Sequence, residues 1–181
     1  MRIIAGTWRG RPLIAPKGDT TRPTADRTRE ALFSMLTSRL GDFEGLSVGD
    51  MFAGSGALGL EALSRGAAQC LFVEQDRAAI DALRANFAKL GATGAQLRPG
   101  SVLALGPAPA ALDLILMDPP YGTGAGAVAL DKLSRLGWIG AHSWVSIETG
   151  AREMVEADGF EIDDSRVYGK ARITLLRRQP D

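Results

Sequence analysis

The stretch DMFAGSGALG, from Asp50 to Gly59, decides the fold of this 181-residue chain. An apolar run leads into it, and the amphipathic segment LGLEALSR leads out of it. This order predicts a strand, a tight turn and a helix whose first backbone N–H groups face a ligand. Gly54, Gly56 and Gly59 have the G-x-G-x-x-G spacing of dinucleotide-binding turns, and the next apolar run ends in Glu74. The turn is therefore expected to bind a nucleotide-like cofactor.

Strands and helices alternate after the glycine turn. Asp76 is expected to cap one helix, and Gly91 is expected to end it. The expected strands cover residues 69–74, 95–98, 112–117 and 144–148, and residues 160–162 and 173–176 are expected to form an antiparallel pair. This alternation predicts a doubly wound α/β sheet, which binds ligands at the carboxyl ends of its strands.

The residues before the turn form a leader outside this alternation. Residues 2–15 are expected to form a hairpin of two short strands, and Thr24 is expected to cap a helix that ends at Gly41. We expect one domain, with a basic extension over residues 1–41 and a catalytic core over residues 42–181.

The charge balance is zero overall but uneven along the chain. Residues 1–39 carry eight Arg or Lys against three acids, whereas residues 40–151 carry seven against eleven. A basic segment at one end of a chain without net charge suits nucleic-acid binding, although exposed arginines also occur on protein surfaces that bind nothing. The single Cys70 lies in an apolar run and is expected to be buried. Without a long apolar segment or a signal-peptide pattern, we expect a cytoplasmic protein that does not contact membranes.

Asp50 distinguishes two candidate cofactors. In NAD, the pyrophosphate would lie against the turn, where an ionised Asp50 would repel it. S-adenosylmethionine carries an ammonium and a sulfonium and has no phosphate, so the same carboxylate favours it. Glu74 can bond a ribose in either cofactor. The sequence therefore favours S-adenosylmethionine and leaves an NAD-dependent oxidoreductase as the alternative.

A second group of candidate residues, Asp118-Pro119-Pro120-Tyr121, follows the apolar strand 112–117. The two prolines fix φ and remove two N–H donors. The Asp118 carboxylate and the Pro119 carbonyl then form a pair of acceptors for an –NH₂ group, which turns its lone pair toward an electrophilic methyl. Tyr121 offers a face on which the base can stack. No strong general base is needed, so His142 is interpreted as a surface or packing residue.

Taken together, these residues resemble a known family. The segments that carry the resemblance are RIIAG (2–6), WRGR (8–11), RPT (22–24), Arg27, REALF (29–33), the stretch 50–66 and residues 112–122. They are similar to the bacterial 16S ribosomal RNA guanine-N2 methyltransferases of the guanine-966 type. Asp-Pro-Pro-Tyr alone would not separate this family from DNA adenine-N6 methyltransferases.

The resemblance implies a seven-stranded, Rossmann-like methyltransferase sheet and methyl transfer to the exocyclic amine of a guanine in small-subunit rRNA. It implies catalytic roles for Asp118, Pro119, Pro120 and Tyr121. The implied cofactor site consists of Asp50, Phe52, Ala53, Gly54, Ser55, Gly56, Glu74, Gln75 and Ser101. The residues expected to contact RNA are Arg2, Trp8, Arg9, Arg11, Arg22 and Arg27. Many relatives have an acid or amide near the adenine, whereas this chain has Ser101, so that contact is expected to be weak.

Other functions remain open at this point. An adenine-N6 DNA methyltransferase shares the chemistry but would normally need an added recognition domain. A non-catalytic RNA-binding protein could keep the same fold. We expect a monomer without a metal site that acts on rRNA, either free or in a partly assembled subunit.

Overall fold

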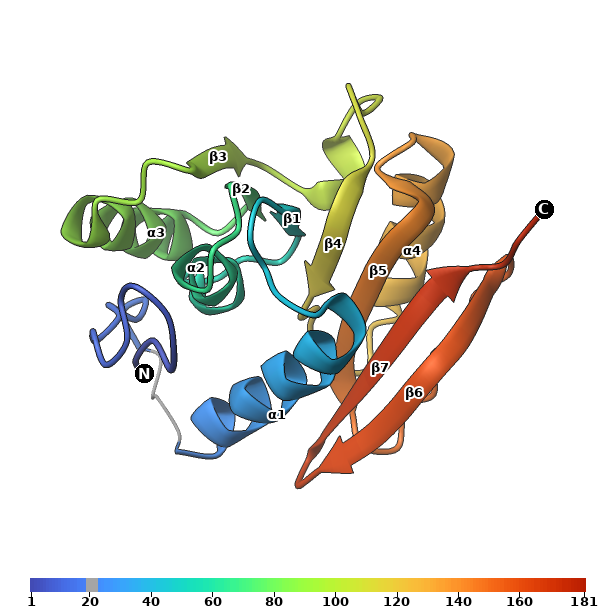
Figure 1. The fold of residues 1–181 in the computed structure, drawn as a ribbon, viewed down its shortest axis with the longest axis horizontal. Coiled ribbons are helices and arrows are strands. Elements are labelled where there is room, and N and C mark those ends of the chain that lie inside the picture. Colours follow the sequence, from blue (N-terminus) through green and yellow to red (C-terminus); the bar gives the residue numbers. More distant parts are fainter. Residues whose placement is uncertain (19–22) are drawn as a thin grey trace.

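The computed structural model describes residues 1–18 and 23–181, and within them one sheet of seven strands has the order β3-β2-β1-β4-β5-β7-β6 (Figure 1). The strands are β1 (Ser47–Asp50), β2 (Gln69–Glu74), β3 (Ala95–Pro99), β4 (Leu112–Met117), β5 (Ile139–Gly150), β6 (Phe160–Tyr168) and β7 (Ala171–Arg178). The helices are α1 (Pro23–Leu40), α2 (Ala57–Ser64), α3 (Arg77–Leu90), the short η1 (Val102–Ala104) and α4 (Ala125–Arg135). The predicted alternation and the doubly wound sheet are confirmed.

The strand order places a ligand crevice between β1 and β4. Strands β1 to β5 run parallel, and β7 is antiparallel to both β5 and β6. From β1 the chain moves outward through β2 to β3, and it then crosses back to β4 on the other side of β1. Such a reversal opens a crevice at the carboxyl ends of the strands. The glycine turn follows β1 there, and Asp118 follows β4.

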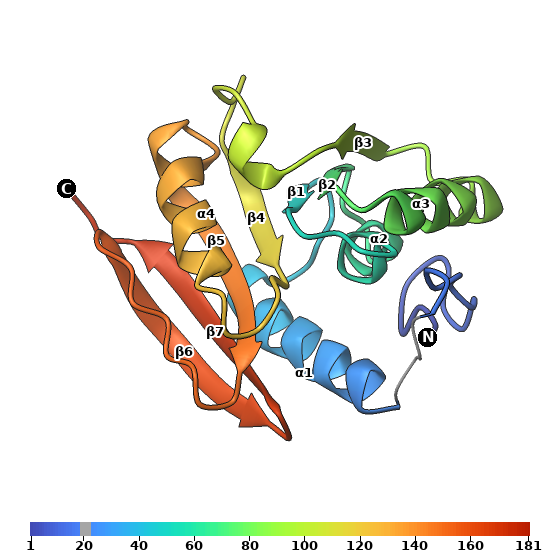
Figure 2. The same ribbon diagram turned by 180° about the vertical axis from the view of Figure 1, so that it is seen from behind.

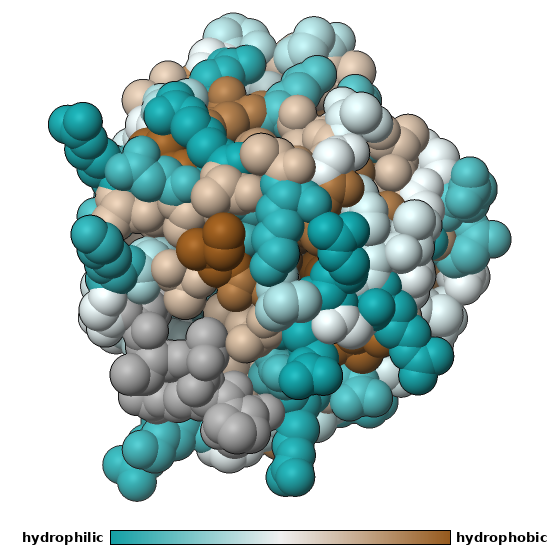
Figure 3. Space-filling view, turned by 90° about the vertical axis from the view of Figure 1, so that its left-hand side faces the viewer, coloured by the Kyte–Doolittle hydropathy of each residue, from teal (hydrophilic) through white to brown (hydrophobic). Residues whose placement is uncertain are grey.

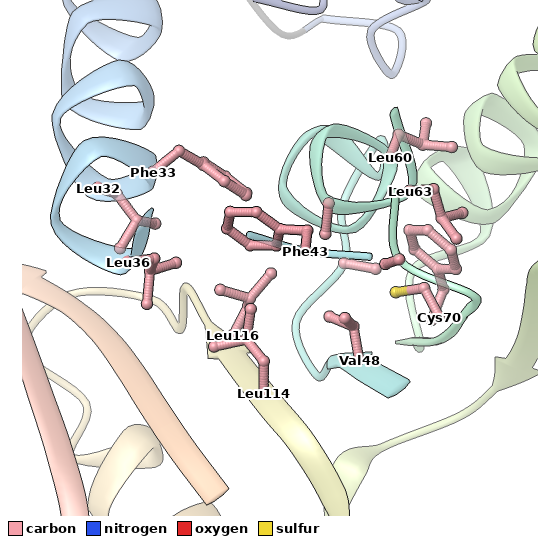
Figure 4. Packing of buried hydrophobic residues seen from close by; sticks show 14 of the residues in the cluster. Leu32, Phe33, Leu36, Phe43, Val48, Leu60, Leu63, Cys70, Leu114 and Leu116 are labelled. Atoms are coloured by element: carbon pink, nitrogen blue, oxygen red, sulfur yellow. The ribbon is translucent and has the colours of Figure 1, made fainter. Parts of the chain in front are cut away.

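Successive side chains of the central strands pack into apolar layers on opposite faces of the sheet. Leu114 and Leu116 pack with residues of α1 and α2 (Figure 4), whereas Ile115 and Met117 pack with residues of α4. The view from behind shows α4 against β4 and β5 (Figure 2). Cys70 is fully buried in the first layer, as expected.

The local signals are largely confirmed. Asp76 caps α3 by accepting from the backbone N–H of Ala79, and Gly91 ends this helix in the left-handed conformation. Gly41 ends α1 in the same way. Helix α1 begins at Pro23, so the prediction that Thr24 lies before the helix as its cap was wrong.

The leader is clamped onto α2 and forms less strand than predicted. Arg2 and Pro12 make an isolated antiparallel bridge in place of two short strands. Backbone N–H groups of this segment donate hydrogen bonds to α2, so fewer of them are left to pair two strands. The fully buried carboxylate of Glu61 accepts from the N–H groups of Ile4 and Ala5, at 2.9 and 3.1 Å.

Helix α1 joins the leader to the far side of the sheet. Near its start, the buried guanidinium of Arg29 donates to the backbone carbonyl of Arg2. At its end, Arg39 forms ion pairs with Asp163 and Asp164 of β6, at 2.9 and 3.1 Å. No helix in the described part of the chain is long and apolar enough to cross a membrane.

Candidate active site

A cavity of about 1450 Å³ lies at the carboxyl ends of β1, β2, β4 and β5. The glycine turn and the loop after β3 line one part of it, and the Asp118–Tyr121 segment lines another. Helix α1 and the turn between β6 and β7 supply further walls, through residues such as Thr28, Leu32 and Lys170. The two groups of residues found in the sequence therefore share one cavity. The walls from α1 and from the β6–β7 turn were not anticipated.

The glycines bring the turn close to the sheet. Gly56 precedes α2 with φ of 91°, a conformation that side-chain-bearing residues rarely adopt. At Gly59 a Cβ atom would lie 2.4 Å from the ring of Phe72 on β2, so only glycine allows the helix to pack this close. The turn thus has the backbone shape and the close helix-to-strand packing that the spacing predicted.

Asp50 lies beneath the turn, fully buried. One carboxylate oxygen accepts from the backbone N–H of Gly59 at 2.9 Å, and the other has no hydrogen-bond partner among the described residues. Burial raises the pKa of Asp50 to about 7; the bond from Gly59 opposes the shift, and the charge of Glu74 adds to it. Asp50 does not line the cavity. Its unpartnered oxygen suits a nearby cation. Asp50 would act on a bound cofactor from beneath the turn and not as part of the cavity wall.

Glu74 presents a fixed carboxylate to the cavity. One oxygen accepts from the N–H of Gly54, and the other accepts from the N–H groups of Gln75 and Asp76, all at 2.8 Å. Three bonds hold the carboxylate in one orientation without using all of its acceptor sites. This geometry supports the expected role of Glu74 in binding the ribose hydroxyls.

The remaining predicted cofactor residues lie around these two acids. Those that line the cavity are Phe52, Ala53, Gly54, Ser55, Gln75 and Ser101. Gly56 does not line it and acts through the shape of the turn. The hydroxyl of Ser101 accepts from the N–H of Leu103 and so caps η1, which leaves its own hydrogen and one acceptor site for a ligand.

The charges around the cavity fit S-adenosylmethionine better than a pyrophosphate. Among the described lining residues the acids are Glu74, Asp76, Asp118 and Glu148, and the cations are Arg29 and Lys170. Arg29 is buried and paired with Asp26, so it is not available at the glycine turn. An acid-rich lining opposes phosphate charges and attracts an ammonium or sulfonium. In residues 1–18 and 23–181 no group of three or more His, Cys, Asp or Glu side chains could hold a metal ion.

Asp118 begins the second group of residues, directly after β4. Its side chain is open to the cavity, yet protein atoms surround it on most sides because the site is deep. Burial, followed by a hydrogen bond to Glu148 and the charge of Glu148, raises the pKa of Asp118 well above its usual range. Pro119 is buried, whereas Tyr121 is 48% exposed and lines the cavity. The structure thus brings Asp118, Pro119 and Tyr121 together in the wall of one cavity.

Glu148 is a site residue that the sequence analysis missed. It lies near the end of β5, lines the cavity and faces both Asp118 and Tyr121. Burial and the charges of Glu148 and Asp118 raise the pKa of the Tyr121 hydroxyl, so the tyrosine stays neutral. The available signal was its position, since Glu148 follows an apolar strand just as Asp50, Glu74 and Asp118 do.

The similarity to known proteins extends over nearly the whole chain. Residues 1–177 match the model of a family described as Conserved hypothetical protein 95. The chain is 39% identical to ribosomal RNA small subunit methyltransferase D of Escherichia coli, over 99% of this chain and 90% of that protein. The chain belongs to this methyltransferase family.

Solved structures of methyltransferases share its fold. A putative methyltransferase from Escherichia coli, 33% identical, aligns with a TM-score of 0.86 over 100% of this chain and 99% of that one. A putative methylase from Haemophilus influenzae, 28% identical, aligns with a TM-score of 0.81 over 99% and 98%. The predicted family, the enzyme class and the Rossmann-like methyltransferase fold are confirmed.

The described candidate RNA-binding residues of this methyltransferase belong to the leader and the start of α1. The leader lies on the side of the molecule shown in Figure 3, where many hydrophilic side chains project. Arg2, Arg9, Arg11 and Arg27 are exposed there. The guanidinium of Arg11 already donates to the backbone carbonyl of Lys89. Trp8 is half-buried against the apolar layer, so its ring is only partly available for stacking on a base. Arg22 lies outside the described residues.

Proposed function

We propose that this enzyme transfers a methyl group from S-adenosylmethionine to the exocyclic N2 amine of a guanine in small-subunit rRNA, at the position of the guanine-966 type. The supporting observation is the shared cavity, in which Asp118 and Pro119 lie beside the glycine turn within an acid-rich lining. The name of the Escherichia coli relative supports rRNA as the substrate. The proposal includes a cytoplasmic monomer that acts on rRNA, either free or in a partly assembled subunit, with the exposed arginines of the leader on RNA phosphates.

The chain's own groups account for the steps around the transfer. Bound S-adenosylmethionine supplies the electrophilic methyl. Glu74 holds the ribose hydroxyls, and Asp50 places negative charge beneath the turn. The carboxylate of Asp118 and the carbonyl of Pro119 accept the two amine hydrogens, so the lone pair of the amine points away from them. The amine becomes acidic once the new C–N bond forms, and the ionised carboxylate of Asp118 can receive its proton.

The test is transfer of tritiated methyl to ribosomal subunits and to naked rRNA, followed by identification of the modified nucleoside. We expect N2-methylguanosine with the wild-type enzyme. Asp118→Ala should abolish transfer and change the affinity for S-adenosylmethionine, measured by calorimetry, by less than about threefold. Asp158→Ala, on an exposed loop, is the matched control and should keep full activity.

Each alternative predicts a different result, which is tested by offering DNA as a methyl acceptor, by titrating a nicotinamide cofactor and by measuring RNA binding. N6-methyladenosine in DNA would support the adenine-N6 enzyme, and micromolar affinity for a nicotinamide cofactor would support the oxidoreductase. RNA binding without methyl transfer would support a non-catalytic protein. Full activity of Asp118→Ala would refute the mechanism given above.

A further inference from the structure

Glu148 and Asp118 lie side by side at the edge of the sheet. Strands β4 and β5 are parallel neighbours, and their register pairs Leu116 with Ser146 and Met117 with Ile147. The next two residues in this register are Asp118 and Glu148. Adjacent strands are about 4.8 Å apart, and alternation places both side chains on the same face. Two carboxylates thus point into the cavity as neighbours.

Glu148 differs from the other glutamates near the cavity in its partners. Glu74 accepts from three backbone N–H groups, and Glu153 accepts from the N–H groups of Gly122 and Gly150. Among the described residues Glu148 has only Asp118 and Tyr121 as hydrogen-bond partners. Glu148 lines the cavity together with Tyr121, and two hydrogen bonds leave some of its acceptor sites free for a base that stacks on this ring.

Guanine carries two neighbouring donors on its Watson–Crick edge, N1–H and the exocyclic N2 amine. Enzymes that act on a base taken out of the stack read this edge by hydrogen bonds. We propose that Glu148 is the residue that selects guanine, by accepting from N1–H while Asp118 accepts from the amine. Two adjacent donors on the base then meet two adjacent acceptors on the protein. This inference rests on the function proposed above.

The same contact rejects bases without an N1 hydrogen. In adenine and in 2-aminopurine, N1 is an acceptor whose lone pair would face the carboxylate of Glu148. The base then loses a charge-assisted bond and leaves the half-buried carboxylate of Glu148 without its donor. Sites built to bond a polar hydrogen discriminate strongly against analogues that lack it. 2-Aminopurine is the informative probe, because it keeps the reactive 2-amino group and changes only the groups at N1 and C6.

The experiment measures kcat/KM for methyl transfer to two rRNA substrates that carry either guanine or 2-aminopurine at the target position. The wild-type enzyme should prefer guanine by about 100-fold, the factor expected for one charge-assisted hydrogen bond. Glu148→Gln has an amide that can also donate to N1, so it should lower this preference to less than about fivefold. Glu161→Gln removes the same charge from an exposed position on β6 and should keep the wild-type preference. Affinity for S-adenosylmethionine, measured by calorimetry, should stay within twofold in both variants.

The outcomes separate this inference from the function on which it rests. If the wild-type enzyme methylates both substrates equally, or if Glu148→Gln keeps the wild-type preference, Glu148 does not read N1. In either case N2-methylguanosine in the guanine substrate would leave the proposed function intact. Absence of methyl transfer to the guanine substrate by the wild-type enzyme would overturn both.

Discussion

Asp50→Asn should stabilise the enzyme at alkaline pH. Burial raises the pKa of Asp50 from its ordinary value of 3.8 to about 7 in the folded protein. A shift of about 3 units corresponds to about 4 kcal/mol by which folding disfavours the ionised carboxyl. The side chain of asparagine has nearly the same shape, can still accept from the N–H of Gly59 and carries no charge. The substitution therefore removes a cost of ionisation that the wild-type protein bears when the carboxyl is charged.

The sign of the pH dependence follows from proton linkage. Because the folded pKa is the higher one, the native state holds a proton between about pH 4 and 7 that the unfolded chain has released. Wild-type stability from this group is thus greatest in acid and falls as the pH rises through the folded pKa. Between pH 5 and pH 8 the loss is about 2.5 kcal/mol, and Asp50→Asn should escape it.

The assay is urea unfolding of both proteins at pH 5 and pH 8. The unfolding free energies of the variant and the wild type must be compared at both pH values, because an unpartnered amide N–H₂ beneath the turn costs about 1–3 kcal/mol at every pH. That cost cancels in the difference, so the stability of Asp50→Asn relative to wild type should rise by about 2.5 kcal/mol from pH 5 to pH 8. The same variant should bind S-adenosylmethionine at least tenfold more weakly, since the negative charge beneath the turn is lost. A relative stability that is unchanged with pH would refute the reasoning.

Two further predictions concern the leader. Glu61→Gln should destabilise the protein by about 3–5 kcal/mol in urea unfolding, because it removes the buried charge that pairs with Arg65 and holds the leader. The amides of Ile4 and Ala5 should then become exposed to hydrogen exchange. Glu30→Gln, at an exposed position on α1, should show neither effect. Replacing Arg9 and Arg27 with serine should reduce the slope of log K against log [salt] for rRNA binding by about 2, since each phosphate contact contributes about 1. An unchanged slope, or an equal change with Arg135→Ser on the opposite face of the sheet, would count against phosphate contacts by the leader.

The elements that could be predicted from the sequence are those fixed by local rules. The spacing of three glycines identified the turn, since Gly59 can be replaced by no larger residue against Phe72. The apolar run of β4 identified a strand buried on both faces, and Asp76 and Gly91 marked the ends of α3. Each of these features depends on neighbours within one or two elements.

The features that were missed depend on contacts between distant parts of the chain. The leader reads as a hairpin because its residues favour strands, but Glu61 of α2, more than fifty residues away, takes its N–H groups. Trp8 reads as an exposed stacking residue because it lies between polar residues at a turn. Its burial depends on the docking of the leader against the apolar layer, and no local pattern reveals that docking.

Glu148 could have been found by extending the argument that found Asp118. Asp50, Glu74, Asp118 and Glu148 each lie at or next to the carboxyl end of a parallel strand. Glu74, Asp118 and Glu148 each follow a residue whose side chain packs on the opposite face, namely Val73, Met117 and Ile147, and Asp50 precedes such a residue, Met51. Alternation therefore points all four carboxylates to one face of one sheet edge, whatever their separation along the chain. Acids gathered in this way repel phosphates and favour a cationic cofactor together with a base that donates hydrogens. The alternation of side chains along the strands therefore predicts both the residues of the site and the kind of ligand that it binds.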